Sequence, residues 1–159
     1  MDYFGASLEL KTVDVGQRLI IGHAAAHENL DRVRDIIDPS ASQKTVARLA
    51  SLSDVACFIG HDSSALPVGI PQKIEATPYG LKTETYILKG PAGDNLLAVA
   101  KDLQDHGQSL GMSIGYITRA SKPDRINGKT VRRIMDYDLK EYSFAAPQFI
   151  ANPKALVTA

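Results

Sequence analysis

The stretch NLLAVAKDLQDHGQSLGMSIGYIT (residues 95–118) decides the fold class, because it changes from a helical to a strand pattern within a few residues. Apolar side chains recur at helical spacing in its first part, at Leu96, Leu97, Val99, Ala100 and Leu103. Gly111 interrupts that pattern, and the MSIGYIT that follows is typical of a β-strand. We therefore predict a helix over residues 95–110 that ends at Gly111 and leads into a strand.

Most of the chain upstream of this helix is predicted to be β-strand. Residues 7–15 alternate apolar and polar side chains, and Gly16–Gln17 is typical of a turn into a second strand over residues 18–26. Further strands are predicted over residues 55–59, 72–77 and 81–88. Residues 40–52 have apolar positions near helical spacing, and either Ser40 or Ser42 is expected to cap that helix.

Downstream of residue 118, the chain predicts a loop and one more strand. Residues 121–129 have the polar composition of a loop, with a turn signal at Asn127–Gly128. Residues 130–145 form a long strand pattern whose alternation changes phase, which indicates a kink or bulge. About seven or eight strands and two helices predict a β-rich α+β fold, a small and mostly antiparallel β-barrel or strongly curved sheet with helices around it.

The composition is that of a single globular domain over residues 1–159. Two hydrophobic cores rarely fit below about 200 residues. The chain has 18 basic and 18 acidic side chains, and this balance argues against an obligate nucleic-acid or anionic-membrane binder. The first residues include acidic and polar side chains where a signal peptide needs a basic start and an apolar run, so no signal peptide is expected. No apolar run approaches the roughly 20 residues that span a bilayer, so no membrane span is expected either.

Cys57 is the single cysteine, so an intramolecular disulfide and a cysteine-based zinc site are both excluded. It lies within an apolar stretch, where a buried, inert thiol is expected rather than a nucleophile.

Three segments of the chain contain side chains that could take part in catalysis. His61 follows an apolar strand pattern, Ser113 stands between glycines in G-x-S-x-G, and the segment DYDLKEYS (residues 136–143) is rich in carboxylates. Each has a purely structural alternative: a surface histidine in a turn, a serine packed in a strand, and a solvated strand face. In α/β-hydrolases the G-x-S-x-G serine lies on a strand-to-helix turn, whereas here a helix precedes the serine and a strand carries it.

Taken together and in order, these segments resemble a known family. The motifs that carry the resemblance are G-H-A near residue 22, D-I-I-D-P-S-A from Asp35, F-I-G-H-D ending at Asp62, G-L at Gly80, G-x-S-I-G-Y ending at Tyr116 and L-x-E-x-S from Leu139. They are similar to those of the tailed-phage prohead serine proteases, or head maturation proteases, which are related to the herpesvirus assembly proteases. The resemblance covers roughly residues 18–153.

The resemblance implies a fold, an activity and a set of site residues. The family has a small, mostly antiparallel β-barrel surrounded by helices, and its members cleave scaffold or capsid-protein segments, and often themselves. By position, His61 matches the catalytic histidine and Ser113 the nucleophile. Glu141 is the candidate for the third member of the triad, although herpesvirus relatives use a second histidine there.

His23 is the alternative third member of the triad. Many family members have an aromatic or small residue at that position, so a histidine here is a departure from the family pattern. His23 and His27 also have an H-x3-H spacing, which on a helix could chelate a metal. The surrounding residues predict a strand, on which four residues span about 13 Å, too far for a single ion. We therefore expect neither a metal nor a cofactor.

The resemblance thus implies a serine endopeptidase that acts inside assembling proheads in the bacterial host cytoplasm. Its partners would be capsid and scaffold proteins, with no obligate nucleic acid and no membrane, and a homodimer or higher oligomer is expected by analogy with the herpesvirus relatives. Two alternatives stay open: a catalytically silent capsid-assembly or scaffold-binding protein of the same fold, and a serine hydrolase of small substrates.

Overall fold

The computed structural model describes residues 1–7, 12–31 and 33–146. In that part of the chain, nine strands and two α-helices follow one another, with one short 3-10 helix, η1 (Leu52–Asp54). The strands are β1 (Asp2–Ser7), β2 (Thr12–Asp14), β3 (Leu19–Ala26), β4 (Asp35–Ile37), β5 (Ala56–Ile59), β6 (Gly69–Ala76), β7 (Gly80–Ile87), β8 (Gly111–Ile126) and β9 (Lys129–Ala145). Residues 8–11 of the strand predicted over residues 7–15 lie outside the described residues.

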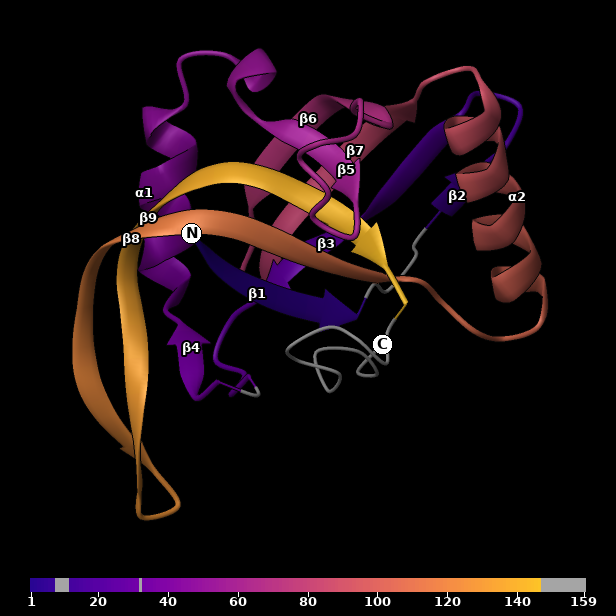
Figure 1. Cartoon of the computed structure of the whole chain (residues 1–159). Coiled ribbons are helices and arrows are strands. Elements are labelled where there is room, and N and C mark those ends of the chain that lie inside the picture. The colour runs from indigo at the N-terminus through magenta and orange to yellow at the C-terminus, as the bar shows by residue number, and fades with distance from the viewer. Residues whose placement is uncertain (8–11, 32, 147–159) are drawn as a thin grey trace.

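The strands form two sheets, and together with the two helices they confirm the β-rich α+β class. One sheet has the order β1-β8-β9-β4, with β5 also pairing with β9, and the other has the order β2-β3-β7-β6. Most pairs are antiparallel, but β4 and β5 both run parallel to β9. Figure 1 shows the long β8 and β9 crossing the molecule side by side.

The expected barrel is not closed by strand pairing among the described residues. β5 and β6 contact each other at the junction of the two sheets. The Val68 N–H donates to the carbonyl of Cys57 there, at 2.9 Å, but no strand ladder follows. β6 is an edge strand, and Pro71 within it has no N–H to offer a neighbour. The fold is therefore a pair of facing sheets rather than a closed barrel.

β8 and β9 correct the prediction of a polar loop over residues 121–129. The Asn127–Gly128 turn is present, with φ values of 50° and 77°. Such a tight turn suits a hairpin, and the strands run up to it on both sides. The polar residues before the turn thus belong to β8, and Figure 1 shows the far ends of both strands projecting as a two-stranded arm. We call residues 119–133 the arm.

The two helices lie close to their predicted positions but differ at their ends. α1 (Pro39–Arg48) is capped by Asp38, whose carboxylate accepts the N–H of Ser40 at 3.0 Å, and not by Ser40 or Ser42. α2 (Pro91–Asp105) ends at His106, and Gly107 follows with φ 72°. A glycine takes this conformation without steric cost, so the chain leaves the helix before Gly111, which instead begins β8. No helix in the described part of the chain is long and apolar enough to cross a membrane.

The core lies between the sheets and holds the site-bearing strands in place. Its fully buried side chains come from both sheets and include Ile20, Leu81, Ile87, Met112, Ile114, Tyr137, Tyr142 and Phe144. Cys57 is completely buried among them, as predicted, and burial raises the pKa of its thiol. Side chains of β8 and β9 alternate between this core and the opposite face, and the candidate site lies on that opposite face.

Candidate active site

The register between β8 and β9 brings Ser113 and Glu141 close together. Ser113 of β8 lies opposite Ser143 of β9, and Gly115 lies opposite Glu141. Ser143 and Glu141 are two residues apart on β9, so both point to the same face of the sheet as Ser113. Ser113 is 4% exposed and Glu141 is 5% exposed.

His61 reaches this face because β5 runs parallel to β9 and ends beside it. Phe58 of β5 pairs with Ser143, and His61 follows three residues later in the turn after the strand. Gly60 and His61 both have left-handed backbone conformations, with φ values of 61° and 59°. Such a conformation is costly for a non-glycine residue and occurs where the surroundings fix it, often at functional sites.

The three predicted residues form one continuous hydrogen-bonded array. His61 Nε2 lies 2.7 Å from Ser113 Oγ, and His61 Nδ1 is hydrogen-bonded to Glu141 Oε1. The imidazole thus stands between a hydroxyl and a carboxylate, which is the arrangement in which a histidine accepts a proton from a serine. The structure brings together all three residues that the sequence singled out.

Ser143 is a fourth member of the array that the sequence analysis did not single out. Its hydroxyl accepts the backbone N–H of His61 at 3.0 Å and donates to Glu141 Oε2 at 2.8 Å. The side chain is fully buried. Ser143 therefore fixes both the turn that carries His61 and the carboxylate that faces it. The available signal was its spacing in L-x-E-x-S, which places Glu141 and Ser143 on one face of a strand.

Gly115 provides the space that the Glu141 carboxylate occupies. A Cβ added at Gly115 would lie 3.0 Å from Glu141 Cδ and would overlap Oε1. The second glycine of G-x-S-x-G is thus required by the third residue of the array, across the β8–β9 ladder. Neither the spacing nor the composition of the motif indicates this use of the glycine.

Tyr3 lies against the exposed side of the array. Its ring contacts the imidazole of His61, with 4.2 Å between ring centroids and an angle of 48° between planes. Tyr3 is opposite Gly115 in the β1–β8 ladder, which places it in the same row as Glu141. No motif in the first residues predicted this contact, because it depends on the pairing of the first strand with the eighth.

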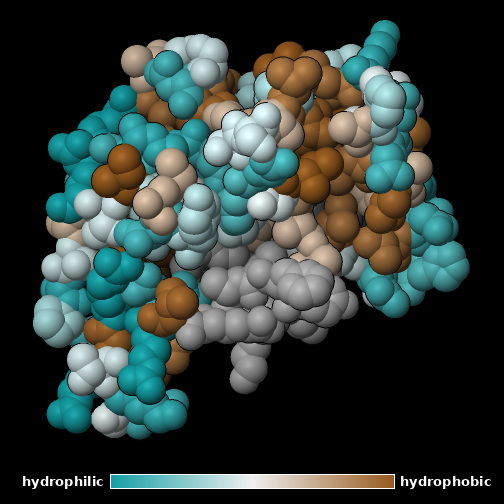
Figure 2. All heavy atoms as spheres, in the orientation of Figure 1, coloured by the Kyte–Doolittle hydropathy of each residue, from teal (hydrophilic) through white to brown (hydrophobic). Residues whose placement is uncertain are grey.

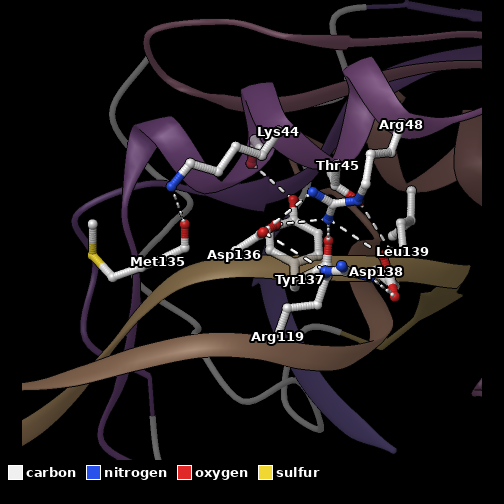
Figure 3. A network of polar contacts seen from close by, with 10 residues as sticks. Lys44, Thr45, Arg48, Arg119, Met135, Asp136, Tyr137, Asp138 and Leu139 are labelled. Carbon is white, nitrogen blue, oxygen red and sulfur yellow. Dashed lines mark hydrogen bonds and ion pairs between the residues drawn. The ribbon is translucent and has the colours of Figure 1, made fainter.

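The other carboxylates of the segment over residues 136–143 point to a different part of the molecule. Figure 3 shows Asp136 and Asp138 directed toward Arg48 of α1 and Arg119 of β8. The shortest of these contacts joins Arg48 Nη2 to Asp136 Oδ1 at 2.6 Å. These aspartates connect α1 to the sheet, so Glu141 is the carboxylate of this segment that faces His61.

His23 does not take the position of a third triad member. It lies on β3 in the other sheet and is 3% exposed, and its ring contacts that of Tyr79 with 4.6 Å between centroids. His27 is hydrogen-bonded through Nε2 to Ser42 Oγ at 2.7 Å, and burial lowers its pKa. In the described part of the chain, no group of three or more His, Cys, Asp or Glu side chains could hold a metal ion.

The fold has a solved counterpart. It is similar to that of the capsid assembly protease gp21 of bacteriophage T4, with a TM-score of 0.61. The match covers 91% of this chain and 97% of that chain, at 11% sequence identity. At this identity the likeness concerns the fold. No protein-family model and no curated protein matches the chain at the sequence level.

Proposed function

We propose that this chain is a serine endopeptidase that cleaves scaffold or capsid-protein segments during phage head maturation, inside assembling proheads. The observation that carries the proposal is the array in which His61 stands between Ser113 Oγ, 2.7 Å from its Nε2, and the Glu141 carboxylate at its Nδ1. The fold likeness to a phage capsid assembly protease supports the class of substrate.

In the first half of the reaction, Ser113 Oγ attacks the carbonyl carbon of the scissile peptide bond. His61 Nε2 accepts the hydroxyl proton as the bond forms, so that a tetrahedral oxyanion and an imidazolium are present together. The imidazolium then gives this proton to the leaving amine nitrogen. The C–N bond breaks, and the acyl group remains as an ester on Ser113.

In the second half, a water molecule takes the place of the departed amine. His61 Nε2 accepts a proton from it while its oxygen attacks the ester carbon, and the same proton returns to Ser113 Oγ as the ester breaks. The products are the two peptide fragments and the free enzyme. No cofactor enters either half of this sequence.

Glu141 orients the imidazole and offsets its charge. Because its carboxylate accepts from Nδ1–H, the lone pair of Nε2 is directed at the Ser113 hydroxyl. The same carboxylate lies against the positive charge that forms on the ring after proton transfer. Ser143, which donates to the other carboxylate oxygen, holds Glu141 in this orientation.

The test is cleavage of the major capsid or scaffold protein by the purified chain, followed by mass spectrometry of the fragments. We expect Ser113→Ala and His61→Ala to lower the rate by at least about 10³-fold, and Glu141→Gln by about 10²–10⁴-fold. Ser53→Ala, which removes an exposed hydroxyl in η1, is the matched control and should leave the rate unchanged.

The same experiment separates the alternatives. Cleavage that survives in Ser113→Ala would refute the serine mechanism, whereas full activity of Glu141→Gln would remove the assignment of Glu141 alone. A chain that binds scaffold protein without cleaving it would be an assembly factor. Hydrolysis of small esters with intact capsid and scaffold proteins would indicate a small-substrate hydrolase.

A further inference from the structure

A groove of about 840 Å³ is lined by residues of β1, of the segment that leads into β4 and of the arm. It is lined by Tyr3 of β1, Val33 from the segment before β4, and Val131 of β9. Tyr3 and Val33 are exposed at 43% and 65%, while Val131 is buried, with 3% of its surface exposed. The ring of Tyr3 also contacts His61, so this residue belongs both to the groove lining and to the surroundings of the array.

The arm has a charge that the whole chain does not show. Residues 119–133 contain six basic side chains and one acidic one, whereas the remainder of the chain has 12 basic and 17 acidic side chains. The formal net charge of zero is thus the sum of a strongly basic arm and an acidic remainder of the chain. Figure 2 shows that the arm is mainly hydrophilic on the face in view, with a few separate apolar residues.

Half of the basic residues of the arm are already paired. Arg119 contacts Asp138 at 3.2 Å, Arg132 binds Asp35 through two nitrogens, and Arg133 contacts Asp124 at 2.8 Å. Such pairs hold the arm to itself and to the body.

Lys122 of the arm and Arg34 before β4 are the two cations of the groove lining outside the ion pairs described above. Both line the groove and are exposed, and neither makes a salt bridge with a carboxylate in the described residues. Two open positive charges therefore flank a groove with apolar walls.

We propose that this groove docks an acidic segment of the protein substrate that also carries apolar side chains, away from the bond to be cleaved. The proposal rests on the proposed function for the identity of the partner as a substrate. Lys122 and Arg34 would pair with its carboxylates, and Tyr3, Val33 and Val131 would contact its apolar side chains.

A polypeptide fits these features better than a nucleic acid does. Contacts with a phosphate backbone require cations and make little use of the apolar walls. The groove is also lined by Asp2, and its partly exposed carboxylate disfavours a continuous polyanion. An acidic peptide can place its separate charges at Lys122 and Arg34 instead.

The docking test uses the Ser113→Ala chain, so that binding is measured without cleavage. The probes are fluorescein-labelled peptides of about ten residues, which span about 33 Å when extended. In one peptide Glu alternates with Val, in the second Lys replaces Glu, and in the third Ser replaces Val. Fluorescence anisotropy gives each Kd, and a short duplex DNA is the fourth probe.

We expect the Glu–Val peptide to bind best, with both replacements weakening binding by about tenfold. Lys122→Glu combined with Arg34→Asn should weaken it by about tenfold as well. Asparagine tolerates the left-handed backbone at residue 34, where φ is 65°. Lys89→Glu, which reverses an exposed charge beyond β7, should change the Kd by less than about twofold.

Binding that is equal in the groove variants and in Lys89→Glu would overturn the proposal. So would a preference for duplex DNA that the groove variants abolish. Val33→Ser is a second variant at an exposed position, and unchanged Glu–Val binding in it would refute the role of the apolar wall. A chain that binds the peptide through the groove but cleaves no protein would refute the proposed function and leave the docking site standing.

Discussion

Ser143 is the residue on which the geometry of His61 depends. It accepts the N–H of a residue in a left-handed conformation and donates to the carboxylate beside the imidazole. We expect Ser143→Ala to lower kcat by about 10–100-fold with little change in KM, because a buried hydrogen bond to a charged group contributes about 1.5–3 kcal/mol. The measurement is kcat and KM of capsid- or scaffold-protein cleavage, with kcat expressed per site titrated by a fluorophosphonate.

Titration of active sites distinguishes this role from a structural one. If Ser143 only supported folding, Ser143→Ala would lower the number of titrated sites and leave kcat per site unchanged. That result would contradict the positioning role.

The array of His61, Ser113 and Glu141 also depends on the small size of Gly115. An added methyl group would overlap the Glu141 carboxylate and displace it from His61. We expect Gly115→Ala to lower kcat by about 10²–10⁴-fold, as Glu141→Gln does, while the chain remains folded by circular dichroism. Gly16→Ala is the control, because a Cβ there makes an ordinary 3.4 Å contact. Equal activity of the two variants would show that Glu141 has room to move.

At the scale of elements, Arg48 is the main polar connection between α1 and β9. Its guanidinium binds both carboxylate oxygens of Asp136 and the carbonyl of Tyr137, as Figure 3 shows. We expect Arg48→Met to lower the free energy of unfolding by about 1 kcal/mol, because a paired carboxylate and a carbonyl lose their donor. Lys101→Met breaks an exposed pair within α2 and should cost less in the same urea titration. Equal losses would mean that the connection adds nothing beyond a surface pair.

At the scale of the whole molecule, Asp31 makes stability depend on pH. Burial raises the pKa of its carboxyl to about 6, although Oδ1 accepts the N–H groups of Val33 and Asp35. Between about pH 4 and pH 6 the folded chain therefore binds more protons than the unfolded chain, so this group lowers stability as pH rises. Above that window the penalty is complete.

Asp31→Asn should remove this penalty, because an amide oxygen can accept the same two N–H groups. We expect the free energy of unfolding in urea to rise by about 1–3 kcal/mol at pH 7 and to change little at pH 4. Asp54→Asn, at an exposed position in η1, is the control. A loss of stability at both pH values would show that the carboxylate is needed for folding.

Local patterns predicted the elements well where a period or a turn signal was strong. The amphipathic helix before Ser113, the strand over residues 19–26 and the Asn127–Gly128 turn all have such signals. The predictions were wrong where the local composition is typical of a different structure from the one that forms. Residues 121–126 are polar but lie in a strand, because each strand of the arm supplies the other's hydrogen bonds.

The sequence by itself determined the β-rich class and the candidates His61, Ser113 and Glu141, because residue type, order and spacing are properties of the chain. It left His23 and Glu141 as alternatives, since neither spacing nor composition says which strands become neighbours. The tertiary structure decided that point by pairing β9 antiparallel to β8 and parallel to β5, which sets Glu141 beside His61 and leaves His23 in the other sheet. Ser143, Gly115 and Tyr3 gained their roles in the same way, through hydrogen-bonded registers between residues far apart in the chain.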